Sequence, residues 1–261
     1  MHRFALIAGI VALTISSTAM AQGRFVAVDN GRRLFEINPL TGEKVQFGEV
    51  SENAGTTAGL AYDAVTGTIY LTSTGNDALY TLDLTTGNAT LVGDYGDSTV
   101  VMHGLEWDSS TGTLYGGSRG MVYGINPSTG AASLVGDTGL GTSFLNLGYD
   151  SINDILYGTY SGTDSFYRID RATGAATLIG SLNGPTNPNG LAFNPDDGRL
   201  YLVDNSTDNL YWIDTTTGTA NLIGSTGSGN LLGLVYVPIP EPGSVTLLAL
   251  GAGALALRRR R

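Results

Sequence analysis

His103 is the side chain of this sequence best suited to acid–base chemistry, because an imidazole titrates near neutral pH and can also bind a metal ion. The chain contains no cysteine, so neither a disulfide framework nor a thiolate metal site can form. No serine and aspartate can be assigned to His103 without an arbitrary choice, and phosphate-loop and EF-hand spacings are absent. The residue types therefore favour a protein without catalytic activity and predict no cofactor.

Most acidic side chains stand at fixed places in a repeated phrase, Asx-x-x-Thr-Gly, which assigns them to turns. The first side chain of the phrase can accept a hydrogen bond from the backbone two residues later, and the glycine closes the turn with a positive φ. The first residues of these phrases are Asp83, Asn126, Asp170 and Asp214. Similar turns begin at Asp63, Asp108 and Asp150. We expect structural roles for all seven.

The turn belongs to a unit that recurs about every 44 residues. One phrase occurs as LYTLDLTTGNATLVG from Leu79, VYGINPSTGAASLVG from Val122, FYRIDRATGAATLIG from Phe166 and LYWIDTTTGTANLIG from Leu210, with a looser copy from Leu34. A second phrase interleaves with it, as GLAYDAVTGTIY from Gly59, GLEWDSSTGTLY from Gly104, NLGYDSINDILY from Asn146 and GLAFNPDDGRLY from Gly190. Each unit thus holds four short runs of β-forming residues, which is the content of one propeller blade.

The two ends of the chain supply parts of one and the same unit. The stretch that begins at Arg24 aligns with the last three strands of a blade, and GLVYV, Gly233 to Val237, matches the missing first strand. The sequence therefore predicts an all-β, five-bladed β-propeller with four-stranded antiparallel blades, closed by a blade shared between the N- and C-termini. An open stack of sheets is the rival architecture, and it leaves the out-of-phase ends unexplained.

The repeated tyrosines and the variable loops receive different predictions. The tyrosines are expected to pack between blades, and they are Tyr70, Tyr115, Tyr157 and Tyr201. The loops between the second and third strands vary in sequence, and the blade crossings lie on the same face of the ring, where His103 is expected near the central channel. We expect any binding function on that variable face.

One blade, PNGLAFNPDDGRLYLVDN from Pro188, resembles the blades of NHL-type and SMP-30/gluconolactonase propellers. In the lactonases an Asn before the Gly and an Asp after the second strand bind a divalent cation, so the resemblance implies Asn189 and Asp204 as metal ligands. The glutamate expected in another blade has no counterpart, because MHG occupies that place at Met102. Two oxygen ligands leave most of the cation's coordination to water. The resemblance of this one blade makes a divalent-metal-dependent, lactonase-like hydrolase that uses the central channel the alternative function.

The N-terminus has the features of a secretory signal peptide. Arg3 precedes an apolar run from Phe4 to Ile15, and Ala19-Met20-Ala21 provides a small-residue cleavage site. The chain holds 23 acidic residues against 13 basic ones, and five of the basic residues are Arg3 and the arginines at the C-terminus. Because nucleic acid and anionic lipid are bound through positive charge, a secreted chain this acidic is not expected to bind either of them.

At the C-terminus the triplet Pro240-Glu241-Pro242 is followed by the apolar run from Val245 to Leu257 and by Arg258, Arg259, Arg260 and Arg261. In its order of features and its terminal position this segment resembles the PEP-CTERM sorting signal. The run is shorter than the roughly 20 residues that span a bilayer comfortably, although its flanks can extend it as a short transmembrane segment. The resemblance implies a Gram-negative bacterium and an exosortase-type protease that cleaves near the triplet. A permanent membrane anchor is the alternative.

These patterns predict a signal peptide at residues 1–21, a β-propeller domain at 22–237 and a PEP-CTERM signal at 238–261. The protein is expected to be secreted to the cell envelope or extracellular matrix, and to be tethered to the membrane by transient insertion of its C-terminal segment before processing. The predicted function is a non-enzymatic binding or structural component of the envelope or of the exopolysaccharide (biofilm) matrix. Its expected partners are the processing protease and a polysaccharide or protein of the matrix.

Overall fold

The computed structural model describes residues 23–239, which form twenty β-strands in five four-stranded antiparallel sheets. Blade 1 has the order β20 (Leu231–Val237), β1 (Arg24–Asp29), β2 (Arg33–Ile37), β3 (Lys44–Glu49). Blade 2 has β4 (Thr57–Asp63), β5 (Thr68–Ser73), β6 (Ala78–Leu82), β7 (Ala89–Asp94). Blade 3 has β8 (Gly104–Asp108), β9 (Thr113–Ser118), β10 (Met121–Ile125), β11 (Ala132–Asp137).

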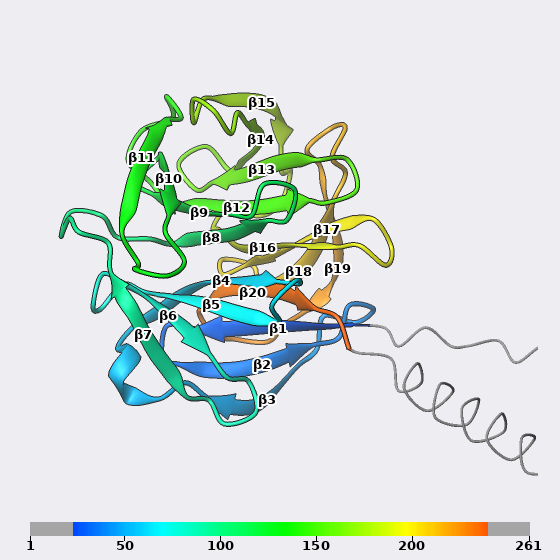
Figure 1. Cartoon of the computed structure of the whole chain (residues 1–261). Coiled ribbons are helices and arrows are strands. Elements are labelled where there is room, and N and C mark those ends of the chain that lie inside the picture. Colours follow the sequence, from blue (N-terminus) through cyan, green and yellow to red (C-terminus); the bar gives the residue numbers. More distant parts are fainter. Residues whose placement is uncertain (1–22, 240–261) are drawn as a thin grey trace, which may run out of the picture. The chain divides into compact units, whose positions relative to one another are not determined.

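Blade 4 has the order β12 (Leu145–Asp150), β13 (Ile155–Tyr160), β14 (Ser165–Ile169), β15 (Ala176–Ser181). Blade 5 has β16 (Pro188–Asn194), β17 (Arg199–Asp204), β18 (Asn209–Ile213), β19 (Ala220–Ser225). A short 3-10 helix, η1 (Glu52–Ala54), joins blades 1 and 2. The first strands of the blades gather at the centre and the fourth strands lie outside (Figure 1), so the predicted five-bladed propeller is confirmed.

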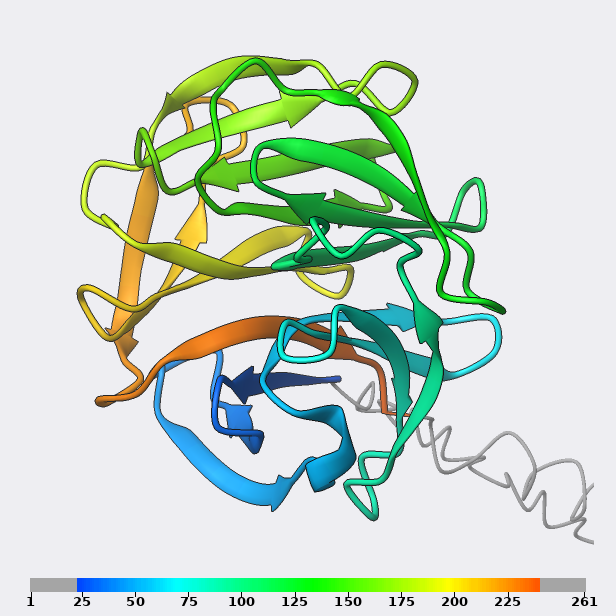
Figure 2. The ribbon, with the colours of Figure 1, turned by 90° about the vertical axis from the view of Figure 1, so that its left-hand side faces the viewer.

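The ring closes through β20, as the sequence predicted. This strand comes last in the chain and pairs antiparallel with β1, with Phe25 opposite Tyr236 and Val26 opposite Val235. Leu234 and Tyr236 face blade 5, whereas Val235 faces blade 2. Figure 2 shows the orange β20 lying beside the blue β1. Val237 is only partly buried, because it ends the strand.

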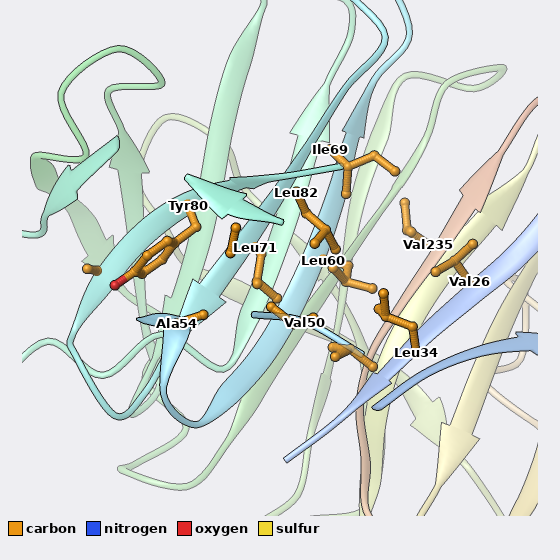
Figure 3. Packing of buried hydrophobic residues seen from close by; sticks show 13 residues of the cluster. Val26, Leu34, Val50, Ala54, Leu60, Ile69, Leu71, Tyr80, Leu82 and Val235 are labelled. Carbon is orange, nitrogen blue, oxygen red and sulfur yellow. The ribbon is translucent and has the colours of Figure 1, made fainter. Parts of the chain in front are cut away.

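The hydrophobic core consists of five clusters, each of which lies between two neighbouring blades. Figure 3 shows the cluster between blades 1 and 2, where Val26 and Val235 meet Leu60 and Leu71. The repeated tyrosines lie in four of these clusters and are nearly inaccessible to water, as predicted; they are Tyr70, Tyr115, Tyr157 and Tyr201. Most of the free energy that holds the blades together therefore comes from burial between them.

The turns have the geometry that the repeated phrase predicted. In the turn of blade 2 the Asp83 carboxylate accepts the Thr85 N–H at 2.7 Å, and Gly87 has a φ of 73°. The equivalent bonds in the other predicted turns run from the backbone to Asn126, Asp170, Asp214, Asp63, Asp108 and Asp150. These turns join strands one to two and three to four, so all of them lie on one face of the ring, here called the turn face.

Glycines allow the blades to approach one another backbone to backbone near the outer rim. A Cβ on Gly130, in the turn of blade 3, would lie 2.3 Å from the Gly93 carbonyl oxygen of blade 2. A Cβ on Gly93 would in turn lie 2.0 Å from the Thr129 carbonyl oxygen. The same pair of glycines recurs at three more junctions, as Gly174 with Gly136, Gly218 with Gly180, and Gly42 with Gly224. This contact accounts for both glycines at these four junctions. At the junction of blades 1 and 2 a Cβ on Gly87 would lie 2.0 Å from the Glu49 carbonyl oxygen, whereas one on Gly48 would meet only a Leu34 side-chain carbon at 3.7 Å.

Within residues 23–239, no helix is both long enough and apolar enough to cross a membrane. The predicted signal peptide and C-terminal transmembrane segment fall on residues 1–21 and 240–261, which lie outside the described residues.

Gly93→Ala is expected to lower the free energy of unfolding by about 1–3 kcal/mol, because the new methyl group overlaps backbone that cannot rotate away. Gly124→Ala is the matched control, since its methyl group would meet only a Val135 side-chain carbon at 4.0 Å. The control should be neutral or slightly stabilising. Urea unfolding of both variants measures the difference, and equal midpoints would show that the glycine contact between blades is not required.

Candidate functional site

An aromatic cup opens at the centre of the turn face, where the five first strands end. Each first strand contributes one aromatic side chain from the same position of the repeat, and these are Tyr62, Trp107, Tyr149, Phe193 and Tyr236. The residue two places later also lines the cup in every blade, as Ala64, Ser109, Ser151, Pro195 and Pro238. The hollow has a volume of about 110 Å³. Tyr62 and Trp107 are partly exposed, so they form the accessible part of its wall.

Among residues 23–239, Glu106 is the one acidic side chain that lines this cup. Burial raises the pKa of its carboxyl to about 8, and the charge of Asp108 adds to the shift. Backbone N–H groups of Trp107 and Tyr149 oppose it, and the Trp107 N–H donates to Glu106 Oε1 at 2.8 Å. At neutral pH the carboxyl is therefore mostly protonated, and it can donate as well as accept a hydrogen bond.

A charged network holds Tyr149 in the wall of the cup. The Tyr149 hydroxyl donates to the Asp154 carboxylate at 2.7 Å, and the Arg171 guanidinium lies over the tyrosine ring. Arg171 also pairs with Asp154 at 2.9 Å and with the buried Asp108 at 2.6 Å. Hydrogen bonds from Arg171 and Tyr149 lower the pKa of Asp154 to about 2, so the network stays ionised across the physiological range.

Asp154 stands where the equivalent turns of other blades have glycine. It has a φ of 59°, a conformation that usually selects glycine, and the equivalent glycine of blade 2 is Gly67 with a φ of 73°. A non-glycine residue there costs conformational free energy. The Asp154 carboxylate offsets that cost through its bonds to Tyr149 and Arg171. The replacement of glycine by Asp154 thus holds one wall of the cup in place.

The other cup aromatics are also held by neighbours. The Tyr236 hydroxyl donates to the Asp196 carboxylate, and the Trp107 ring stacks on Tyr70 with centroids 5.9 Å apart. The Trp107 indole N–H has no hydrogen-bond partner within residues 23–239. The cup is thus a largely preformed set of aromatic surfaces beside one protonated acid, and such a set suits the binding of a small ring-shaped ligand.

Sequence reasoning missed this site, although the repeat contained its signal. In the phrases GLAYD, GLEWD, NLGYD, GLAFN and GLVYV the fourth residue is always aromatic. The third residue is small or aliphatic in four copies and is Glu106 in the other. A charged residue at a position that is apolar in the other four copies was the signal in the sequence for a candidate site.

The central channel leaves little room for a ligand. First-strand glycines pack directly against the backbone of the next blade, as where a Cβ on Gly190 would lie 2.5 Å from the Leu234 nitrogen. Asn146 replaces the glycine in blade 4, and its side-chain amide donates to the Pro188 carbonyl at 3.0 Å. The hollow between these strands has a volume of about 10 Å³, which is room for roughly one water molecule.

His103 lines this narrow hollow, as its predicted place near the channel suggested. Its ring lies against Phe144 with centroids 4.0 Å apart. Burial, aided by the charge of Arg119, lowers the pKa of His103 to about 4, so the imidazole is neutral at physiological pH. No hydrogen bond from the ring to another part of residues 23–239 is formed, and its main contact is the aromatic one.

Asn189 and Asp204 are both buried, and both are used in holding the blade crossing. The Asp204 carboxylate accepts the Asn187 N–H at 2.7 Å and the Thr207 N–H at 2.8 Å, while the Asn189 amide donates to the Asn187 carbonyl at 2.8 Å. Among residues 23–239, no group of three His, Cys, Asp or Glu side chains is placed to hold a metal ion. Metal binding by these two residues stays a prediction.

The variable face carries a separate, larger hollow of about 290 Å³ in blade 2. Its wall includes Asp77, Asp94 and Asp97. The last two carboxylates cap their own loop, because Asp94 accepts the Gly96 N–H at 3.1 Å and Asp97 accepts the Thr99 N–H at 2.8 Å. The hollow is therefore acidic, and two of its three carboxylates already accept backbone hydrogen bonds.

The proposed sorting residues Pro240, Glu241, Pro242 and Arg258–Arg261 lie outside the described residues. Comparison with protein families places them: residues 238–261 match the PEP-CTERM protein-sorting motif. The chain carries a PEP-CTERM signal. This signal implies export, sorting at the C-terminus to the cell envelope and processing by an exosortase. Within the propeller of this PEP-CTERM protein, residues 140–229 match a "Repeat of unknown function (DUF6923)".

Solved structures share the fold at low sequence identity. A chain of a nidogen/laminin complex is 16% identical with a TM-score of 0.57, and the match covers 83% of this chain and 86% of that one. A protein of unknown function from Bacteroides thetaiotaomicron is 16% identical with the same TM-score of 0.57, over 86% of this chain and 63% of its own length. Virginiamycin B lyase from Staphylococcus aureus is 15% identical, over 86% and 73%, with a TM-score of 0.48. No curated protein matched.

Proposed function

We propose that this PEP-CTERM protein is a non-enzymatic binding component of the cell envelope or exopolysaccharide matrix, and that the aromatic cup holds a polysaccharide of that matrix. In this proposal residues 1–21 are removed on export and residues 22–237 form the binding domain. Residues 238–261 tether the protein to the membrane until exosortase cleaves near Pro240, Glu241 and Pro242.

The observation that carries the proposal is the ring of five aromatic side chains, one from each blade. Aromatic faces pack against the C–H faces of sugar rings and replace water there at a small cost in side-chain entropy. Two of the five aromatic side chains, Tyr149 and Tyr236, are fixed by hydrogen bonds from their hydroxyl groups to Asp154 and Asp196. A preordered apolar surface loses less conformational entropy on binding than a mobile one does.

The lactonase-like alternative has less support from the geometry. A channel cation would need space and several oxygen ligands at about 2.3–2.6 Å for Ca²⁺. The axial hollow is about 10 Å³, and Asp204 already accepts hydrogen bonds from the backbone of two segments. A saturable rise in melting temperature with Ca²⁺ or Zn²⁺, abolished by Asp204→Ala, would favour the hydrolase instead.

Removal of the accessible aromatics should weaken binding to the host's purified extracellular polysaccharide. Tyr62→Ala and Trp107→Ala are each expected to raise Kd at least tenfold, or about 1.4 kcal/mol, because these side chains form the exposed wall of the cup. Trp212→Ala is the control, since Trp212 lies under Arg199 and does not line the cup. Calorimetric titration of variants whose melting shows them folded measures the effect. Unchanged affinity in both cup variants would move the site elsewhere.

Sorting is expected to depend on the C-terminal triplet. Replacement of Pro240, Glu241 and Pro242 together by alanine should leave the propeller folded, because the triplet lies beyond β20, and the protein should accumulate uncleaved in the membrane fraction. Leu40→Ala and Val65→Ala, at exposed turn positions, form the control. Intact-mass measurement of protein from the native host decides the matter: wild-type protein that still contains Arg258–Arg261 would contradict exosortase processing.

A further inference from the structure

Among residues 23–239, no positively charged side chain lines the cup. The Arg171 guanidinium lies over the Tyr149 ring of the cup wall, but it is already paired with Asp108 and Asp154. Recognition of a carboxylate or sulfate on a ligand normally uses a free cation or several converging N–H donors. An acidic sugar would therefore bind near Asp108, Asp154 and the Glu106 carboxyl, with no unpaired cation in the lining to offset its negative charge.

Glu106 supplies the polar part of the wall. Its Oε1 accepts the Trp107 backbone N–H, and the Tyr149 backbone N–H also acts on the carboxyl. A protonated carboxyl with these acceptor contacts still has one O–H to donate to a ligand. Asp108 follows it on β8, Tyr115 lies opposite it on β9, and Tyr149 lies on the neighbouring β12. The other titratable or charged groups around the cup are Tyr62, Tyr236 with Asp196, and the pair of Arg171 with Asp154.

We propose that the cup selects uncharged sugar residues, and that Glu106 binds them as a neutral acid by donating its O–H to a sugar oxygen. This inference rests on the proposed function. The volume of about 110 Å³ limits the ligand to about one sugar ring in the cup, so the rest of a chain would extend outward.

The pH dependence of binding has a definite sign. The Glu106 pKa of about 8 means that the carboxyl is neutral at pH 6 and mostly ionised at pH 9.5. Ionisation removes the O–H donor and places a negative charge among apolar rings. If only the protonated form binds, apparent affinity should fall about thirtyfold from pH 6 to pH 9.5, because Kd rises as the competent fraction falls.

The same proton affects folding. The unfolded chain titrates near the ordinary value of 4.5, whereas the folded chain holds the proton up to about pH 8. Because the folded state holds the proton more tightly than the unfolded state, the free energy of unfolding falls as pH rises from about 4.5 to about 8. Glu106→Gln should therefore gain stability relative to the wild type between pH 4.5 and 8, which tests the protonation state without any ligand.

A glycan array on the full chain, with neutral oligosaccharides of glucose and mannose beside oligomers of uronic acids, tests the charge selection. Binding to neutral members and not to uronates supports the inference. Uronates that bind as well as or better than neutral sugars would overturn it and leave the proposed function standing. Failure to bind any glycan would overturn both.

Titration of the best neutral ligand at pH 6 and pH 9.5 then tests Glu106 itself. The wild type should lose about thirtyfold in affinity, whereas Glu106→Gln should bind at both pH values with little change, because the amide is uncharged and keeps an N–H donor. Far-ultraviolet circular dichroism at both pH values confirms that each protein is folded. An equal loss in both proteins, or no loss in the wild type, would remove Glu106 from recognition.

Discussion

The pairing of β20 with β1 is the interaction on which the other features of this propeller depend. It joins the last strand of the chain to the first and completes blade 1, so that each of the five blades has two neighbours. Glycines then let adjacent blades approach until backbone meets backbone, at Gly190 near the axis and at Gly93 near the rim. Because these contacts fix the spacing of the blades, the closed ring brings the five first-strand ends to one place and forms the aromatic cup.

Within this fold, the repeat provides the scaffold, and the candidate site is found where the sequence departs from the repeat. Asp83 and its equivalents build the turns, where their side chains accept backbone N–H groups. Glu106 and Asp154 break the pattern, and both lie at the cup. One supplies a carboxyl with a raised pKa, and the other fixes Tyr149 at the cost of a positive φ.

The fold was predictable because its determinants are local and repeated. The Asx-x-x-Thr-Gly turns, the four strands per unit and the return of Gly233–Val237 to the blade of Arg24 all follow from spacing and residue type. The sequence did not predict the candidate cup, and binding on the variable face stays a prediction. Whether Tyr62 and Trp107 are packed or accessible depends on where five strands end around a closed axis, which spacing alone does not determine. The desolvation of the Glu106 carboxyl likewise depends on how the strands meet around the closed axis.

The central claim is that β20 closes the ring and thereby builds the cup, and chain length tests it most directly. A chain that ends at Gly233 loses the buried Leu234, Val235 and Tyr236, each worth up to about 1.5–3 kcal/mol, against a total stability of about 5–15 kcal/mol for a domain. Thermal unfolding should show one cooperative transition for a chain that ends at Val237. The chain that ends at Gly233 should aggregate or melt at a far lower temperature. Equal, cooperative melting of the two chains would contradict closure by the shared blade.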